Sequence, residues 1–511
     1  MYTLAPAWLT QLLRQRWVWA MLALGTGLHL ALALAVNLSV DEAHYALYAS
    51  HLDWSYFDHP PLVGWLQWPA LQLGGSDLAM RVVPTLCWVL TALGIVRLSD
   101  TLFAGTSLPF WAGIRLDAWL LLISPLPHLL GLALVPDSLL MPLTCAVMAV
   151  CWLLCHAPQR SSTPLWLALG LCLGLAGLAK YTAVLLALGA AVVLLRAHGW
   201  RLLAQRGPWL AVSVAALCVV PVFAWNAQHD WISLAYQLGH AQGSGEWKLR
   251  KVLVFVLVVL LAHGLLLPLA WRDRFVAQPA QQAPPSAGFF CGSFALPTLL
   301  LLAYLSGRGS ALPHWATPAC LALIPPAAVA LTALWQKRKR WVLSLAAAQA
   351  TGFAAVLLCM VAGGTGSETG AQAVSLPGAD ASQRPANPFA DVHGWPQAAQ
   401  QAQALAQRYQ ISSLAVMNWT LASRLAWYAK PVPVKVIDQR RDQFDLWFGA
   451  VQPQESVLLV DWSQMSFTPP VGPKQFERCD YLGQMPVLRA GRQIAHFNFL
   501  HCQRWRMDSL P

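Results

Sequence analysis

The sequence predicts a polytopic α-helical membrane protein of about 11 spans, with a small C-terminal α/β domain outside the membrane. Hydrophobic residues make up 57% of the 511 positions and charged residues only 11%, which excludes an ordinary soluble enzyme. Apolar stretches of about twenty residues, long enough to cross a bilayer as helices, recur as far as residue 362. Beyond that residue the long apolar stretches stop, which indicates a separate soluble unit.

The expected spans all lie in this first part of the chain. They are 17–37, 77–98, 108–126, 137–155, 163–179, 181–197, 208–224, 249–270, 288–305, 316–335 and 341–362. Arg14 and Arg16 precede the first apolar stretch, as in a signal peptide, but that stretch is long and a charged segment follows it at once. We therefore expect the first stretch to remain in the protein as a span.

The net charge of +11 indicates membrane topology and not a nucleic-acid partner. Lys and Arg fall in short clusters between the apolar stretches, such as 337–340, and these clusters occupy alternate loops. Because cytoplasmic loops carry an excess of basic residues, we expect the basic side to face the cytoplasm. The opposite loops and the tail then face outwards, and every candidate functional residue lies on that outer side.

The tail is expected to form a small α/β unit. A Gly, Ser and Pro-rich linker at 363–388 leads into a soluble outer domain at 389–511, which is long enough to bury its own core. The pattern predicts helices at 395–409 and 413–428 and strands at 432–437 and 457–460. Cys479 and Cys502 share this domain, so they either form a disulfide or remain free thiols.

The stretch 40–65, VDEAHYALYASHLDWSYFDHPPLVGW, follows the first span and holds four carboxylates and three histidines. It has no Gly or Pro between Asp41 and Ser50, which predicts a short helix with Tyr45 and Tyr48 on the face of Asp41. An interfacial helix with a solvated acidic face is the simpler alternative. The density of titratable groups favours chemistry at the membrane surface.

This stretch resembles the first outer loop of family 39 and related C-type glycosyltransferases, which include the protein O-mannosyltransferases and the lipid A aminoarabinose transferase. The most specific part is Asp41-Glu42 followed by Asp58-His59-Pro60-Pro61. Further similar segments are Pro136-Asp137, 178–182 (LAKYT), 225–229 (WNAQH), His314-Trp315, 393–395 (HGW) and 443–447 (QFDLW). The resemblance implies the C-type glycosyltransferase fold, with 38–76 as the catalytic outer loop of a transmembrane domain 1–362.

The resemblance also implies transfer of a sugar from a polyprenyl-phosphate carrier to an acceptor hydroxyl, with inversion at the anomeric carbon. Such a reaction needs a carboxylate to take the acceptor proton, and Asp41 matches the first acidic residue of the family. Glu42 is the second carboxylate of that pair, but adjacent helical residues point about 100° apart, so we expect it to bond the backbone or a neighbouring loop. Asp137 matches the second acidic residue of the fold. A structural role, in which Asp137 caps the N-terminus of the fourth span, explains its position equally well.

The departing phosphate needs cations, and the outer loops offer Arg81, Lys180, Arg308 and His59. Lys180 is the leading candidate because it interrupts two apolar spans, where an ionisable side chain needs water or a partner. Alternatively, Lys180 lies in a short turn and extends its side chain to the membrane surface, and Arg81 anchors the chain to lipid headgroups.

The sequence leaves open whether the protein requires a divalent metal cation. Asp58 and His59 stand where the lipid A transferase has a metal-associated glutamate followed by a lysine, so both residues differ. Asp58 and an outer-loop His such as His314 can bind a cation, but losing the lysine removes a fixed positive charge near the phosphate. His44, Tyr45 and Tyr48 complete the expected substrate loop. No soluble cofactor motif is found.

The acceptor class is left open by the sequence, since a lipid, an envelope glycan and a protein all present an alcohol. A polyprenyl-linked sugar flippase or a transporter is the alternative to a transferase, although no internal repeat of the kind common in transporters is visible. We expect a multi-pass protein of the bacterial inner membrane, with the active site and the C-terminal domain facing the periplasm.

Overall fold

The computed structural model describes residues 7–156, 163–242, 245–271, 285–365, 387–438 and 440–506. The chain divides into two compact units, each treated by itself. The first comprises Met1–Ala31, Asp53–Leu66 and Arg81–Phe353, and the second comprises Leu32–Leu52, Gln67–Met80 and Ala354–Pro511. Most of the expected linker 363–388, namely 366–386, lies outside the described residues.

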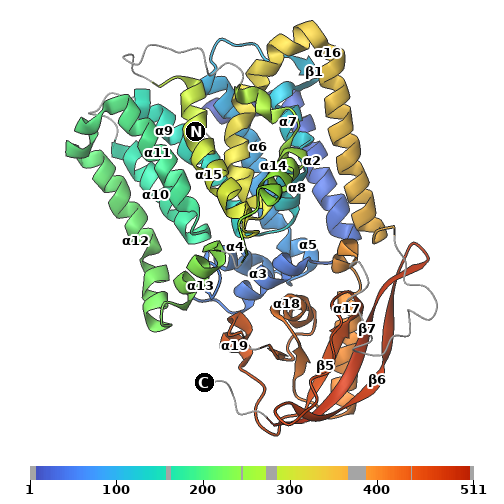
Figure 1. Cartoon of the computed structure of the whole chain (residues 1–511). Helices are drawn as coiled ribbons and strands as arrows, with labels where there is room; N and C mark the ends of the chain where they lie inside the picture. The colour runs from blue at the N-terminus through green and yellow to red at the C-terminus, as the bar shows by residue number, and fades with distance from the viewer. Residues whose placement is uncertain are drawn as a thin grey trace. The chain divides into compact units, whose positions relative to one another are not determined.

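Up to residue 362 the chain is almost entirely helical (Figure 1). In chain order the elements are α1 (Ala7–Leu13), α2 (Arg16–Ala35), α3 (Val40–Ser50), α4 (Leu62–Gln72), α5 (Asp77–Met80), α6 (Val82–Leu102), β1 (Phe110–Trp111), β2 (Ile114–Arg115), α7 (Leu116–Leu122), α8 (Pro125–Leu132), α9 (Pro136–His156), α10 (Thr163–Ala179), α11 (Ala183–His198), η2 (Trp200–Ala204), α12 (Arg206–Gln228), α13 (Ile232–Gln242), α14 (Leu249–His263), η3 (Leu267–Trp271), α15 (Ala287–Ser306), η4 (Pro313–Ala316) and α16 (Thr317–Ala362).

The polytopic helical class is confirmed, whereas the number of spans is not. Among the described residues, six helical segments are long and apolar enough to cross a membrane: Arg16–Ala35, Asp77–Leu102, Pro136–His156, Arg206–Gln228, Ala287–Ser306 and Pro313–Ala362. Two further apolar helices, Thr163–Ala179 and Ala183–His198, are shorter. The expected spans 316–335 and 341–362 run together in α16, with one non-helical residue at Arg338.

The expected single span at 108–126 is wrong. In its place a β-hairpin pairs β1 with β2, and the short helices α7 and α8 follow. Ala112 and Gly113 both have positive φ, at 45° and 78°, as a tight hairpin turn requires. Pro125 then starts a new helix after Ser124, because proline lacks the amide that would continue the previous one. Apolar composition alone does not show either break.

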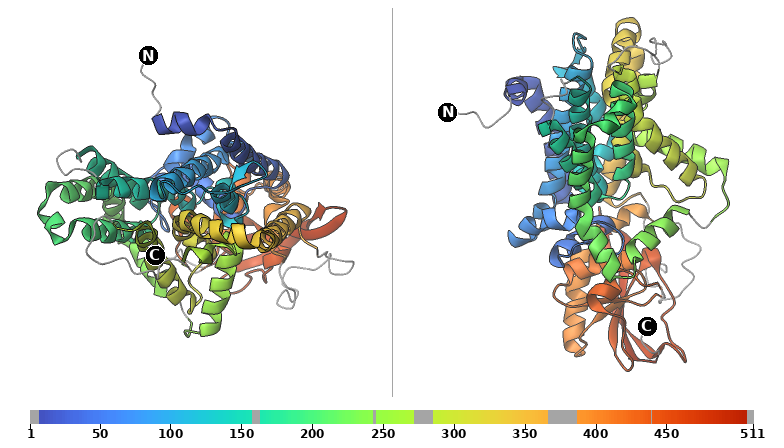
Figure 2. Two further views of the ribbon diagram at one scale, coloured as in Figure 1. Left: turned by 90° about the horizontal axis from the view of Figure 1, so that it is seen from above. Right: turned by 90° about the vertical axis from the view of Figure 1, so that its left-hand side faces the viewer.

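Close helix packing in the first unit depends on glycine. Helices α10 and α12 lie side by side (Figure 2). A Cβ built on Gly170 would lie 2.5 Å from the carbonyl oxygen of Ala211, and one on Gly174 would lie 2.6 Å from the Cβ of Cys218. Small residues therefore let the two backbones approach, which is how helices associate where no water drives them together.

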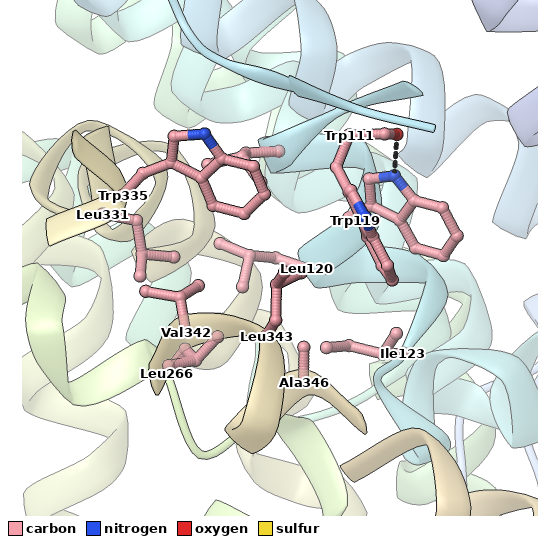
Figure 3. A pocket seen from close by; sticks show the side chains of 11 residues that line it. Trp111, Trp119, Leu120, Ile123, Leu266, Leu331, Trp335, Val342, Leu343 and Ala346 are labelled. Carbon is pink, nitrogen blue, oxygen red and sulfur yellow. Dashed lines mark hydrogen bonds between the residues drawn. The ribbon is translucent and has the colours of Figure 1, made fainter. Parts of the chain in front are cut away.

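A pocket in the first unit is lined by apolar and aromatic side chains alone (Figure 3). Trp111, Trp119 and Trp335 form much of its wall, and Trp119 Nε1 donates to the Trp111 carbonyl oxygen at 2.8 Å. The remaining lining residues are Leu116, Leu120, Ile123, Leu266, Leu331, Val342, Leu343 and Ala346. The pocket suits an apolar group and offers no acid, base or cation, so it is not the candidate site.

The tail folds as an α/β unit, as its sequence predicts (Figure 1). Its five-stranded sheet has the order β4-β3-β5-β7-β6, with β3 parallel to β4 and β5, and β7 antiparallel to β5 and β6. The elements are η7 (Pro388–Val392), α17 (Trp395–Arg408), β3 (Leu414–Val416), α18 (Trp419–Tyr428), β4 (Val434–Val436), α19 (Gln443–Phe448), β5 (Val457–Trp462), η8 (Ser463–Met465), β6 (Phe476–Arg489) and β7 (Arg492–Trp505).

The predicted elements of the tail match with one correction. The expected helix 413–428 begins too early, because 414–416 is the strand β3. Asn418 caps α18 by accepting a hydrogen bond from the Leu421 amide at 3.1 Å, which sets the helix start. Cys479 and Cys502 form a disulfide between β6 and β7, so the bonded alternative is confirmed.

Helix α3 shares a core with the tail. Leu38, Ala43, Ala46 and Leu47 belong to the same buried apolar cluster as Trp395, Leu421 and Phe497. The predicted domain boundaries at 362 and 389 remain predictions, but the packing adds a fact that they did not anticipate. The first part of the expected catalytic loop 38–76 packs in one compact unit with the tail.

Candidate functional site

The predicted short helix after the first span is α3, and its start explains the position of Glu42. Glu42 Oε2 accepts hydrogen bonds from the Ser39 amide at 2.9 Å and from Ser39 Oγ at 3.0 Å. These contacts satisfy backbone and hydroxyl groups at the helix N-terminus, as expected for this second carboxylate. Asp41, one position earlier, points about 100° away from Glu42 around the helix axis.

The expected substrate residues of α3 lie in an aromatic cluster of the second unit. His44, Tyr45 and Tyr48 are all buried. Five ring centroids lie between 5.2 and 6.0 Å from that of His44, and they belong to Tyr45, Tyr48, Trp419, Phe444 and Trp447. Ser423 Oγ lies 3.3 Å from His44 Nδ1. The cluster holds α3 against the tail helices, and a contact with substrate stays a prediction.

Asp442 is an acidic residue near this cluster that the sequence did not single out. Burial raises its pKa from 3.8 to about 6; the hydrogen bond from the Phe444 amide and the charge of His44 oppose the rise, and the carboxylates of Asp445 and Asp438 add to it. Asp442 Oδ1 accepts from the Phe444 amide at 2.8 Å and so caps α19. Because the folded state keeps this proton up to about pH 6 and the unfolded state releases it near 3.8, stability falls as pH rises between those values.

A second cluster, in the first unit, brings together three residues that the sequence offers separately. Lys180 Nζ donates to Asp137 Oδ2 at 2.6 Å, and His314 Nε2 lies 3.6 Å from the same oxygen. The ammonium also lies 4.9 Å from the centre of the Trp315 ring. Asp137, Lys180 and His314 were expected to serve as a catalytic-site carboxylate, a phosphate ligand and a metal ligand, respectively. The structure brings them together in one polar cluster around the Asp137–Lys180 ion pair.

Each of these residues stands where a helix begins or is interrupted. Asp137 is the second residue of α9, Lys180 lies between α10 and α11, and His314 lies in the single turn of η4. Lys180 is only 3% exposed, which argues against snorkelling as its explanation. The buried atom Asp137 Oδ1 has no hydrogen-bond partner within the described ranges, so this carboxylate can accept one more donor.

The other predicted cations differ in exposure. Arg81 is buried at the start of α6, whereas Arg308 is exposed, with its carbonyl oxygen accepting from Lys251 Nζ at 3.3 Å. His59 is half-buried, and its carbonyl oxygen accepts from the Tyr56 amide at 3.1 Å. Burial makes Arg81 the stronger candidate of the three for a ligand that is taken out of water.

The expected metal ligands do not form a recognisable metal centre. Throughout the part of the chain that the structure describes, no group of three or more His, Cys, Asp and Glu side chains is placed to hold a metal ion. The Asp58 carbonyl oxygen accepts from Gln237 Nε2, and His314 faces Asp137 beside the Lys180 ammonium. The ammonium would repel a metal cation placed beside it.

Asp53 has a structural role that sequence reasoning missed. Its Oδ2 accepts from Trp225 Nε1 at 2.8 Å, and its Oδ1 accepts from the Trp54 amide at 2.7 Å. Trp225 in turn stacks on His229, with ring centroids 3.9 Å apart. The segment 225–229 thus holds the loop after α3 in place. The similarity of both segments to one family was the available signal that they work together.

Comparisons with known proteins agree with the resemblance found in the sequence. Residues 58–225 match the family described as dolichyl-phosphate-mannose-protein mannosyltransferase. A lipid A galacturonosyltransferase, RgtD of Rhizobium johnstonii, is 30% identical over 216 residues. That stretch covers 42% of this chain and 42% of the relative, so the match spans less than half of either protein.

The fold resembles that of ArnT from Cupriavidus metallidurans. The structure of ArnT bound to undecaprenyl phosphate matches with a TM-score of 0.62 and 18% identity, covering 95% of this chain and 98% of ArnT. The apo structure matches with a TM-score of 0.55 and 17% identity, covering 93% and 97%. The resemblance to C-type glycosyltransferases is therefore confirmed, and the fold extends over nearly the whole chain.

Proposed function

We propose that this protein is an inverting glycosyltransferase that moves a sugar from a polyprenyl-phosphate carrier to an acceptor hydroxyl. The observation that carries the proposal is the buried Asp137–Lys180–His314 cluster in a chain with the ArnT fold. A buried ammonium that is held at a helix interruption is suited to an anionic headgroup entering from the membrane. The relative ArnT was solved with undecaprenyl phosphate, which supports a carrier of that class.

In the proposed reaction the Asp41 carboxylate takes the proton of the acceptor hydroxyl as its oxygen attacks the anomeric carbon. The bond between that carbon and the phosphate oxygen breaks, and the carrier phosphate leaves with the electron pair. A single displacement of this kind inverts the configuration at the anomeric carbon. Glu42, committed to the start of α3, keeps the helix and hence Asp41 in position.

Lys180 and Arg81 are proposed to hold the carrier phosphate and to stabilise the charge that grows on it. Asp137 has two proposed functions, since its Oδ2 fixes the Lys180 ammonium and its Oδ1 can accept a hydroxyl of the sugar. Arg308 and His59, which are more exposed, are assigned to an outer contact with the carrier or the acceptor. A metal requirement remains an expectation from the resemblance alone.

The acceptor is proposed to be a glycolipid, an envelope glycan or a protein on the periplasmic face of a bacterial inner membrane. RgtD acts on lipid A, which favours a lipid acceptor within this group. The alternation of basic loops supports the orientation. It can be tested with cysteines placed at Leu73 and Leu488, which are 84% and 64% exposed, and an outside-specific thiol reagent. Labelling that appears only after permeabilisation would reverse the orientation.

The function is tested by comparing lipids and envelope glycans, by mass spectrometry, from cells with wild-type protein, with Asp41→Asn and with no protein. Loss of a general base typically lowers the rate by about 10²–10⁴. We expect a sugar adduct in wild-type cells that Asp41→Asn nearly abolishes while the purified variant still binds carrier. A flippase would instead move the lipid-linked sugar without breaking its phosphate bond, and Asp41→Asn would leave any adduct at wild-type level.

A further inference from the structure

The apolar pocket of the first unit lies where the β1–β2 hairpin meets the turn of α16. Figure 3 shows Trp335 on one side of the pocket and Trp111 and Trp119 on the other. Both arms of α16 line it, with Trp335 before the non-helical residue Arg338 and Ala346 after it. The pocket therefore lies in the angle where the chain turns back between two apolar stretches.

This pocket has a buried floor and a partly open rim. Leu120 and Leu331 are buried, whereas Trp111, Trp119 and Trp335 are half-buried. The rings of Trp111 and Trp119 pack on each other, with centroids 4.7 Å apart. A cavity without polar partners does not hold water well, so an apolar pocket that opens at a rim of tryptophans suits a hydrocarbon chain.

Aromatic side chains gather at this end of the unit, as they do where a helix bundle meets a membrane surface. Trp17, at the start of α2, packs edge to face on Phe110 of β1, with ring centroids 5.8 Å apart. Trp341, just after the turn of α16, is 48% exposed. Because this turn separates two stretches of span length, the rim of the pocket is expected at the level of the lipid headgroups.

The turn of α16 places a fixed positive charge at this rim. Lys337, Arg338, Lys339 and Arg340 are consecutive and all exposed. Lys339 Nζ lies 5.0 Å from the centre of the Trp335 ring, which is part of the pocket wall. Helix α16 contains no Asp or Glu that could neutralise the four side chains. An anionic group is therefore favoured next to the opening of the pocket.

The carboxylates beside the opposite wall are already paired. Arg115 Nη2 lies 2.6 Å from Asp117 Oδ2, and Arg115 Nη1 lies 2.5 Å from Asp100 Oδ1. The Asp117 side chain is fully buried, so its charge is directed to Arg115 and not to the surface. These two acids compete little with a ligand for the cations at the turn of α16.

We propose that the pocket and the basic turn form a binding site for an anionic phospholipid. A segment of one acyl chain lies between the tryptophans, and the phosphate lies at Lys337–Arg340. The apolar lining selects the chain, and the basic turn selects the charge of the headgroup. The bound lipid joins the two arms of α16 to the hairpin. This site shares no residue with the Asp137–Lys180–His314 cluster, and the proposal does not depend on the proposed reaction.

The test measures lipid binding to the purified full-length protein in mild detergent, by native mass spectrometry and by the unfolding temperature. Phosphatidylglycerol is compared with phosphatidylcholine that carries the same acyl chains. We expect phosphatidylglycerol to bind more tightly and to raise the unfolding temperature more, since a ligand of the folded state stabilises it. Equal binding of the two lipids would overturn the proposal.

The contribution of charge is tested by Lys337→Gln combined with Lys339→Gln, at exposed positions. Each basic residue near a membrane surface contributes about fivefold to the binding of an anionic lipid, so the double variant should bind phosphatidylglycerol about twenty-fivefold less tightly. The control Arg441→Gln with Lys474→Gln removes the same charge from exposed positions of the tail and should bind as the wild type does. An equal loss in both double variants would show that binding follows net charge alone and would overturn the site.

The contribution of the pocket is tested by Ala346→Phe, which fills it without changing its charge. Each buried methylene contributes about fourfold, so displacing two or more should weaken phosphatidylglycerol binding by at least about tenfold. The control Ala347→Phe changes an exposed neighbour that does not line the pocket, and it should bind as the wild type does. If Ala346→Phe does not fold, Ala346→Leu and Ala347→Leu give the same comparison with a smaller side chain.

Two outcomes of the filling experiment would overturn the proposal. One is unchanged phosphatidylglycerol binding in a folded protein with a filled pocket. The other is a loss of undecaprenyl phosphate binding with no loss of phosphatidylglycerol binding, because the occupant of the pocket would then be a polyprenyl chain.

Discussion

The ion pair between Lys180 and Asp137 allows stability and catalysis to be separated by substitution. The two side chains are 4% and 2% exposed, and Nζ lies 2.6 Å from Oδ2. Removing one partner of such a buried pair leaves the other charge uncompensated, at a typical cost of about 3–5 kcal/mol. We expect Lys180→Met to destabilise the protein by that amount, because Asp137 then keeps a buried charge beside the His314 imidazole, whose Nε2 is 3.6 Å away, and has lost the ammonium that paired with it.

The double substitution Lys180→Met with Asp137→Asn removes both charges and should recover most of this loss. A coupling energy of at least about 2 kcal/mol is expected, since residues in direct ionic contact depart from additivity by up to about 3 kcal/mol. The measurement is unfolding of the wild type, the two single variants and the double variant in one detergent. Strictly additive effects would show that the two residues do not stabilise each other.

Transfer activity should behave differently from stability in the same four proteins. If Lys180 holds the carrier phosphate, Lys180→Met lowers kcat/KM by about ten- to a hundredfold, and Asp137→Asn cannot restore it because the cation is still missing. Assays at a temperature where all four proteins remain folded make the comparison fair. Recovery of wild-type transfer in the double variant would mean that Lys180 serves only to neutralise Asp137.

Three further predictions concern other parts of the molecule. Asp442→Asn keeps the cap of α19 but removes a carboxyl whose pKa is raised to about 6. The substitution should therefore stabilise the protein by up to about 3 kcal/mol at pH 7.5, and by progressively less towards pH 4. An equal change in stability at the two pH values would contradict the raised pKa. Gly174→Val should push α10 away from α12 and lower the stability of the protein by about 1–3 kcal/mol. The control Gly27→Ala should be neutral, because its Cβ would meet nothing within 4 Å. Equal unfolding temperatures for the two variants would contradict the packing argument. Arg81→Gln should weaken carrier binding by about ten- to a hundredfold, measured with a polyprenyl phosphate in detergent. The control Arg441→Gln, at an exposed position of the tail, should leave the affinity unchanged. Equal affinities for the two variants would mean that Arg81 does not bind the carrier.

Local sequence patterns were sufficient for the elements that depend on local physics. Helix α3 was predicted at 41–50 and is found at Val40–Ser50, because a run without Gly or Pro after a capping Ser39 specifies a short helix. The hairpin at Phe110–Arg115 was missed, since hydropathy cannot distinguish an apolar hairpin from part of a span. Only Gly113 carried a local signal, because glycine is favoured where a turn needs positive φ, and Ala112, which also has positive φ, gave none.

The charged cluster required contacts that one sequence does not reveal. Asp137 and Lys180 are 43 positions apart, and nothing in their neighbourhoods specifies the other as partner. The cost of burying a charge predicts only that a lysine between apolar helices needs a partner. The sequence could therefore single out Lys180, but it could not identify Asp137 as the partner.

The position of α3 explains why the tail matters to the chemistry that we propose. A short helix of 11 residues is marginal by itself, so its geometry depends on what it packs against. Its apolar residues Ala43, Ala46 and Leu47 are buried in the core that contains Trp395 and Leu421 of the tail. Any change that loosens this core would move Asp41 without touching it, and a displacement of about 1 Å at a catalytic group can cost about 10²-fold in rate. Under the proposed function, the tail therefore acts on the reaction through the helix that carries Asp41, without needing a contact with the sugar or the carrier.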